Sequence, residues 1–260
     1  MLEERCDLNK RELVKEFAHK HRYFTLKEVV KASGASNQLT KNYLQELKQA
    51  GIVFSAGKGV YSSVAKEFRL TEKSRVVKIR QLLKKQLPYL DFLAWNTLYF
   101  QPYHHHQQTH NITFVEVELD AIRSVADMIS HEYRSVLIEK AGRAAPKNFD
   151  ITHNPIVVRR LIKRLSYQGH VPTLEKMLVD LFVIKNKYST MQDSDYWDLW
   201  RSIDKLFRVN IGNLISYARA RRYFRDMLLQ LNDNIGFNNV TFGAYMKYAA
   251  EVMSKKNIHD

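Results

Sequence analysis

Amide and lysine side chains recur on one side of a helix expected between residues 37 and 50. They follow one another at intervals of four, four and three residues, which bring side chains to a common side of a helix. Asn and Gln can form paired hydrogen bonds with adenine, and Lys binds phosphate or guanine. The pattern is typical of DNA binding as well as of a solvated surface. The residues are Asn37, Lys41, Gln45 and Lys48, flanked by Gln38 and Asn42, with Lys58 at a nearby turn.

Histidines form a second cluster, at His104, His105, His106 and His110. Imidazoles bind metals or transfer protons. Adjacent residues of an extended chain point to opposite sides, however, and no Cys or nearby Asp or Glu completes a set of ligands. We interpret the cluster as an exposed loop and expect no metal site.

Acidic residues on a strand expected over residues 112–119 raise the alternative of a nuclease. Glu116 and Glu118 alternate along this strand and so share a face, while Glu139 and Lys140 end the next strand. Carboxylates that hold Mg²⁺ beside a lysine are typical of metal-dependent nucleases. Because neighbouring Glu139 and Lys140 point apart, the spacing fits such a site poorly. A solvent-facing sheet edge is the favoured interpretation.

Arginines lie close together late in the chain, on a long helix expected over residues 211–231. Tyr217, Tyr223 and Phe224 are interleaved with them, so the band can contact phosphates or an acidic protein, or remain a solvated helix face. The arginines are Arg219, Arg221, Arg222 and Arg225.

The elements that must position the amide and lysine surface are helices in the first 65 residues. Apolar residues at helical spacing predict helices over residues 10–21, 26–33 and 37–50. Thr25 with Glu28 forms a capping box, Gly34 ends the second helix, and Ser36 caps the third. Two short apolar runs around a glycine-bearing turn then predict a β-hairpin over residues 52–61. This order is typical of a winged helix-turn-helix.

The next region reads as a mixture of helices and strands. A helix is expected over residues 74–86, followed by strand-like runs at 89–94, 112–119, 135–139 and 155–158. Asp120 is expected to cap a helix that carries apolar residues from Ile122 to Ile129. The resulting strand, helix, strand order predicts that part of the sheet is parallel.

From residue 173 onward the apolar spacing is helical. We therefore predict an α+β chain with a winged helix-turn-helix domain over residues 1–73 and an α/β domain over residues 74–190. Residues 191–260 are expected to form a helical extension packed on the α/β domain.

Bulk charge points to a polyanionic partner. The 260 residues include 41 Lys and Arg against 27 Asp and Glu, a formal net charge of +14, spread along the chain. Cys6 is the single cysteine, which excludes an internal disulfide and a Cys-based zinc site. No secretory signal and no membrane-spanning run is evident, so we expect a cytoplasmic protein with no membrane partner.

With these features in view, the chain resembles AbiEi-type antitoxins, a family of transcriptional regulators in type IV toxin–antitoxin systems. The resemblance covers about residues 10–185. It rests on the N-terminal helices and the hairpin up to Tyr61, and on the runs Leu93–Thr97 and 112–118.

The resemblance implies that the first domain binds double-stranded DNA at the operator of its own operon. It also implies that the second domain counteracts a nucleotidyltransferase-like toxin, without naming residues for that activity. We expect no enzyme activity, catalytic residue or cofactor. The alternatives are a metal-dependent nuclease guided by the winged helix, in a defence or mobile-element system, and a protein adaptor. The oligomeric state stays open.

Overall fold

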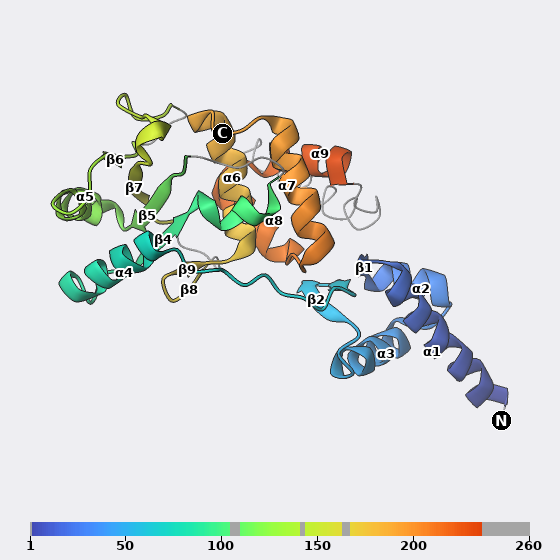
Figure 1. Cartoon of the computed structure of the whole chain (residues 1–260). Coiled ribbons are helices and arrows are strands. Elements are labelled where there is room, and N and C mark those ends of the chain that lie inside the picture. Colours follow the sequence, from blue (N-terminus) through green and yellow to red (C-terminus); the bar gives the residue numbers. More distant parts are fainter. Residues whose placement is uncertain (1, 105–109, 141–143, 163–166, 236–260) are drawn as a thin grey trace, which may run out of the picture. The chain divides into compact units, whose positions relative to one another are not determined.

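The computed structural model describes residues 2–104, 110–140, 144–162 and 167–235 (Figure 1). These residues form helices and small sheets, which confirms the α+β class. They divide into two compact units. Unit 1 contains residues 2–67, 206–212 and 224–235, and unit 2 contains the described parts of 68–205 together with 213–223.

Unit 1 begins with three helices whose ends follow the expected capping signals. The Thr25 hydroxyl accepts from the Glu28 N–H, and the Glu28 carboxylate accepts from the Thr25 N–H at 2.7 Å. Gly34 ends the second helix at φ 65°, and the Ser36 hydroxyl accepts from the Leu39 N–H at 3.2 Å. The elements are α1 (Leu2–Lys20), α2 (Leu26–Ser33) and α3 (Asn37–Gln49), with α9 (Phe224–Ile235) much later in the chain.

A three-stranded antiparallel sheet follows the order β1 (Tyr23–Thr25), β3 (Val60–Ser62), β2 (Phe54–Gly57). The β2–β3 hairpin was expected, but β2 starts later than residue 52. The reason is that the N–H groups of Ile52 and Val53 still donate to the Leu47 carbonyl at the end of α3. Strand β1 was not expected.

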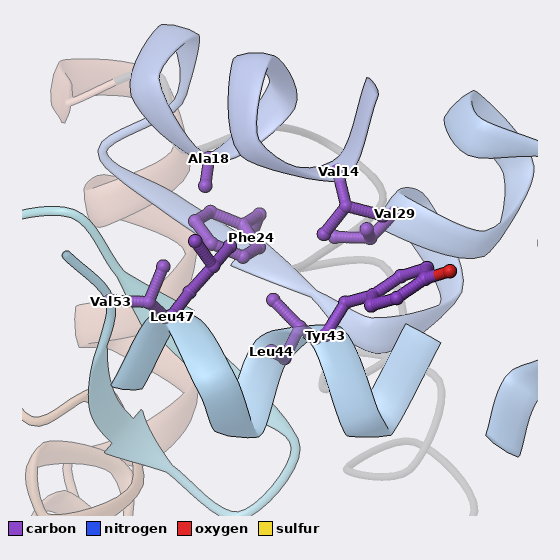
Figure 2. Packing of buried hydrophobic residues seen from close by; sticks show 8 residues of the cluster. All are labelled: Val14, Ala18, Phe24, Val29, Tyr43, Leu44, Leu47 and Val53. Carbon is purple, nitrogen blue, oxygen red and sulfur yellow. The ribbon is translucent and has the colours of Figure 1, made fainter. Parts of the chain in front are cut away.

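An apolar cluster holds the helices of unit 1 to the sheet. Figure 2 shows side chains of α1, α2 and α3 converging on Phe24 of β1. All eight residues of the cluster are buried, and each large apolar side chain buried in this way contributes about 1.5–3 kcal/mol. They are Val14, Ala18, Phe24, Val29, Tyr43, Leu44, Leu47 and Val53.

Unit 2 is built around a four-stranded mixed sheet. Its strands are β4 (Phe92–Asn96), β5 (Thr113–Val117), β7 (Ile156–Arg160) and β6 (Val136–Ile138), in that spatial order. β4 runs antiparallel to β5, while β5 and β6 both pair in parallel with β7. The expected parallel pairing is confirmed, although β7 inserts between the two strands of the expected strand, helix, strand unit.

Helices cover both faces of this sheet. Helix α5 lies on one face and α6 on the other, and α4 packs beside β4 (Figure 1). Asp120 does not cap α5, because a short 3₁₀ turn over Leu119–Ala121 comes first and Ala121 occupies the cap position. The α-helices are α4 (Ser74–Gln86), α5 (Ile122–Ser130), α6 (Leu174–Tyr188), α7 (Asp193–Leu206) and α8 (Ile211–Ala220).

The smaller elements of unit 2 connect these strands and helices. They are the 3₁₀ turns over Thr97–Tyr103 and Ile151–His153 and the short strands β8 (Tyr167–Gln168) and β9 (Val171–Pro172).

The single long helix expected over residues 211–231 is wrong. Helix α8 ends at Ala220, Arg222 adopts a left-handed backbone with φ 63°, and α9 begins at Phe224. The Tyr223 N–H donates to the Ala218 carbonyl at 3.0 Å and so closes the helix end. Residues 191–235 are accordingly shared between the units. Unit 2 contains α7 up to residue 205 and α8 from residue 213. Unit 1 contains residues 206–212 and α9.

Candidate nucleic-acid interface

Helix α3 presents its polar side to solvent. Tyr43, Leu44 and Leu47 are buried beneath it, so the opposite side of the helix faces outward. The structure brings six of the seven expected residues together on this outward surface and places the seventh at the hairpin turn. All seven side chains are exposed: Asn37, Gln38, Lys41, Asn42, Gln45, Lys48 and Lys58.

Few interactions within the protein occupy this surface. The Gln38 amide donates to the Asn42 side-chain oxygen at 3.2 Å. Lys41 and Lys48 form no ion pair with any described residue. The one carboxylate of the helix, Glu46, pairs with Arg11 of α1 at 2.9 Å. The exposed side of α3 therefore keeps a positive charge and free amide groups.

The dimensions of α3 suit the major groove of DNA. A helix with its side chains is about 10–12 Å wide, and the major groove is about 12 Å wide. At ~1.5 Å per residue, the distance from Asn37 to Lys48 is about 17 Å, which corresponds to roughly five base pairs at ~3.4 Å each. Amides and lysines over that length can contact both base edges and phosphates.

The hairpin turn that follows α3 in the chain is formed by glycines. Gly57 has φ 135° and Gly59 has φ 73°, backbone conformations that residues with a side chain rarely adopt. The pairing register shifts between Ser55 and Gly57, which marks a bulge at the end of β2. Lys58 lies between the two glycines with its side chain exposed.

Residues 206–212, which we term the return segment, pack against this hairpin although they lie about 150 residues later in the chain. Val209 and Ile211 of the segment are fully buried. The Arg208 N–H donates to the Lys66 carbonyl at 2.7 Å, and the Val209 N–H donates to the Tyr23 hydroxyl at 2.9 Å. The segment thus ties β1 to the chain that leaves β3.

The Arg208 side chain makes several polar contacts with the chain that follows β3. Its guanidinium donates to the carbonyls of Val64 and Ala65 at 3.0 and 3.3 Å and pairs with Glu67. It also stacks over the Phe54 ring, 4.5 Å from the ring centre. The Arg208 side chain thus joins β2 to the chain that follows β3.

Gly57 and Gly212 bring two backbones into direct contact. A Cβ added at Gly57 would lie 2.7 Å from the Gly212 nitrogen, and one added at Gly212 would lie 3.0 Å from the Gly57 Cα. A side chain at either position would therefore force the facing backbone to shift, by more at Gly57 than at Gly212. The return segment cannot be predicted from the sequence, because nothing in a local apolar pattern links residues so far apart.

The carboxylates considered for a nuclease have quite different surroundings. Glu116 lies on the central strand β5 beside Arg159 of β7, and both are buried. One Glu116 oxygen accepts from Arg159 at 2.7 Å, from Lys176 at 2.7 Å and from the Trp95 indole at 3.1 Å. Asp180, one turn after Lys176 on α6, accepts from the same two cations at 2.7 and 2.5 Å. We term Glu116, Arg159, Lys176 and Asp180 the buried ionic cluster.

The cations of this cluster keep its carboxylates charged. Burial would by itself raise the pKa of Glu116, but Arg159 and Lys176 outweigh it and hold the pKa below its ordinary value. The same balance lowers the pKa of Asp180, with Arg221 contributing from 3.1 Å. Burial works against the charged form of Arg159, but Asp180 and Glu116 raise its pKa well above the ordinary value.

The expectation that Glu116 and Glu118 share a solvent-facing sheet edge is wrong. Strand β5 is interior to the sheet and ends at Val117, so Glu116 is buried and Glu118 is exposed beyond the strand. Two cations already occupy the Glu116 carboxylate, an arrangement suited to structure and not to a divalent metal. Among the described residues, no group of three His, Cys, Asp or Glu is placed to hold a metal.

A family model matches residues 39–236, and its description is a family of unknown function, DUF6577. The chain belongs to the DUF6577 family. The matched range includes most of α3, the hairpin, the return segment and all of unit 2. No curated protein is similar to the sequence.

Two further groups of candidate residues in this DUF6577 chain are the histidine cluster and the arginine band. His104 follows the 3₁₀ turn that ends at Tyr103, and His110 is exposed, whereas His105 and His106 lie outside the described residues. The arginine band is not continuous, because Arg221 turns inward to Asp180 while Arg222 and Arg225 are exposed. None of the described helices is long and apolar enough to cross a membrane.

Proposed function

We propose that this protein is a DNA-binding transcriptional regulator in which unit 1 acts as a winged helix-turn-helix. In this assignment α2 and α3 form the helix-turn-helix and the β2–β3 hairpin forms the wing. The observation that carries the proposal is the outward side of α3, where six amide and lysine side chains are exposed, while Tyr43, Leu44 and Leu47 pack on the inner side.

Each residue of this surface has a role in the proposal. Asn37, Gln38, Lys41, Asn42 and Gln45 meet base edges in the major groove, where bidentate amides and lysines discriminate bases. Lys48 and Lys58 contact phosphates and so position the helix.

The target and the biological setting rest on the resemblance to AbiEi-type antitoxins. On that basis the DNA is the operator of the protein's own operon, and unit 2 counteracts a nucleotidyltransferase-like toxin in the cytoplasm. Discovery of a nucleotidyltransferase-like reading frame next to this gene would support the antitoxin role. Failure of the full chain to relieve the toxicity of such a neighbour contradicts it.

The experiment that tests DNA binding compares the full chain with a Lys41→Ala, Gln45→Ala double variant. A labelled duplex from upstream of the gene is titrated in a gel-shift assay between 50 and 200 mM salt. We expect salt-dependent binding by the wild type, and a loss of at least ~1–3 kcal/mol with relaxed base preference by the double variant, because it lacks the base-reading amide of Gln45.

The matched control is Lys20→Ala, which removes one exposed charge from α1 and leaves α3 intact. We expect this variant to keep the base preference of the wild type. Binding of the double variant equal to that of the wild type would remove α3 from the interface. Absence of salt-dependent retention by any duplex would favour a protein adaptor.

A further inference from the structure

Helix α4 of unit 2 carries basic side chains and no acid. Its sequence from Ser74 to Gln86 contains five Lys or Arg residues without any Asp or Glu. The only other described α-helix without an acid is α8, whose single basic residue is Arg219. An unbalanced helix of this kind repels itself unless a partner of opposite charge is near.

Two of the five cations have partners inside unit 2. Arg80 pairs with Glu72 just before the helix. The Arg75 guanidinium donates to the Asn154 carbonyl at 2.7 Å and stacks over the Tyr133 ring at 5.7 Å. These two side chains hold α4 in place.

The other three cations point to solvent. Lys78, Lys84 and Lys85 are exposed and form no ion pair with any described residue. Lys78, Gln81 and Lys85 follow at intervals of three and four residues, so they share one side of the helix. Tyr89, just after the helix, is completely exposed. The outward side of α4 is thus a surface of lysine and amide groups.

The inner side of α4 limits what this surface can bind. Val76, Ile79 and Leu83 are fully buried within unit 2, so no apolar side is left to enter a membrane or to receive an amphipathic helix. Lysine is depleted at protein interfaces, whereas lysine and tyrosine are common donors to DNA phosphates. Lys78 and Lys85 are two turns apart, about 10 Å, which is close to the axial distance over three phosphates of one strand.

We propose that the outward side of α4 is a second DNA-binding surface, one that contacts the phosphates of duplex DNA and carries no base preference. This proposal rests on DNA binding by unit 1, to which α4 is joined by residues 63–73. DNA held by α3 is thereby kept at a high effective concentration near the lysines of α4.

The test uses the full chain with Lys78→Ala, Lys84→Ala and Lys85→Ala combined. Fluorescence anisotropy with a labelled duplex of about 40 base pairs gives Kd as a function of NaCl concentration. Each phosphate contact contributes ~0.9 to the salt slope, so we expect the slope to fall by about 3 and the affinity to fall about ten- to a hundredfold near 0.15 M salt. The base preference is expected to stay unchanged.

The matched control removes three exposed lysines elsewhere in unit 2, by Lys140→Ala, Lys147→Ala and Lys205→Ala. This variant has the same net charge as the α4 variant and is expected to keep a slope within about one of the wild type. A second variant with Lys78, Lys84 and Lys85 changed to Arg is expected to bind as the wild type does. Equal slopes for the α4 and control variants would overturn the proposal.

Failure of this proposal can be told apart from failure of the proposed function. If the α3 double variant loses base preference while the α4 variant keeps its salt slope, only the α4 surface is wrong. If the α4 variant loses affinity and the α3 variant does not, the α4 surface stands and the role of α3 is wrong. Binding of the wild type to phosphatidylserine vesicles, lost in the α4 variant while DNA binding is not, would assign the surface to lipid and overturn the proposal.

Discussion

Lys41 of α3 and Lys176 of α6 are the same residue type in opposite surroundings. Lys41 is exposed and forms no ion pair with a described carboxylate, whereas Lys176 is fully buried between Glu116 and Asp180. Unit 1 is held together by an apolar cluster and by backbone contacts, and its ion pairs, such as Arg11 with Glu46, lie at the surface. Unit 2 instead places ion pairs inside.

The net charge of this chain must therefore be interpreted according to whether each charge is buried or exposed. A buried lysine such as Lys176 is balanced by the carboxylates of its cluster, so it adds nothing to the formal net charge of +14 and attracts no partner. A lysine on the outward side of α3 or α4 contributes to the field that a polyanion experiences. Only the second kind supports DNA binding, and its variants must therefore change affinity without changing stability.

The largest effect is expected from Glu116→Ala. The change leaves Arg159 and Lys176 with Asp180 as their shared carboxylate, and breaking one partner of a buried ion pair costs about 3–5 kcal/mol. Urea unfolding followed by tryptophan fluorescence measures the loss. Glu118→Ala is the matched control, since Glu118 is exposed and its removal should cost less than about 0.5 kcal/mol. Equal stabilities of the two variants would show that the cluster does not hold unit 2 together.

Acid is expected to weaken unit 2 through the same carboxylates. The pKa values of Glu116 and Asp180 are lowered in the folded protein, and the unfolded values are about 4. Their contribution is therefore complete above about pH 4 and is lost as the pH falls through the lowered folded values, because the unfolded chain then binds more protons. The urea midpoint of the wild type should fall more steeply from pH 5 to pH 3 than that of Glu116→Gln. Parallel profiles would contradict this.

A smaller effect is expected in unit 1 from Gly57→Ala. The added Cβ would meet the Gly212 nitrogen at 2.7 Å, and such overpacking costs about 1–3 kcal/mol. Gly59→Ala is the comparison, because Gly59 also has a positive φ but nothing lies within 4 Å of its added Cβ. Thermal unfolding of both variants isolates the contact with the return segment. If Gly59→Ala proves the more damaging, backbone strain and not this contact determines the stability of the hairpin.

The smallest effect on stability is expected from Lys48→Ala. Its side chain is exposed and unpaired among the described residues, so the melting temperature should stay within about 1–2 °C of the wild type. The salt slope of DNA binding should nevertheless fall by about one, uniformly over different sequences. A loss of stability without a change in the salt slope would mean that the charge of Lys48 supports the fold, as the charges inside unit 2 do, and does not contact DNA.

The sequence predicts the elements with local signals well. The capping box at Thr25, the glycine at position 34 and the serine at position 36 each appear where expected, because each acts within a few residues. Strand β1 was missed because three residues carry little local pattern and its pairing partner, β3, is far along the chain. The break at Arg222 was missed because no Gly or Pro marks it.

The buried ionic cluster shows why the sequence wrongly predicts that Glu116 faces solvent. Lys176 and Asp180 are four residues apart, a spacing usually found for a surface ion pair. The sequence did contain an indication that these charges are buried. Apolar residues occur on nearly every side of α6, and a charge on such a helix must lie inside the protein. Recognising Glu116 as its partner also required the order of the strands, which local patterns do not contain.

The return segment has a consequence for how the protein is made. Tyr23, Phe54 and Gly57 of unit 1 find their contacts in residues 206–212, which follow most of unit 2 along the chain. At roughly 5–20 residues per second, a ribosome needs about 7–30 s to synthesise the intervening stretch. The contacts of β1 and β2 are therefore completed only after those later residues have been made, and a truncated translation product that lacks them leaves the hairpin unsupported.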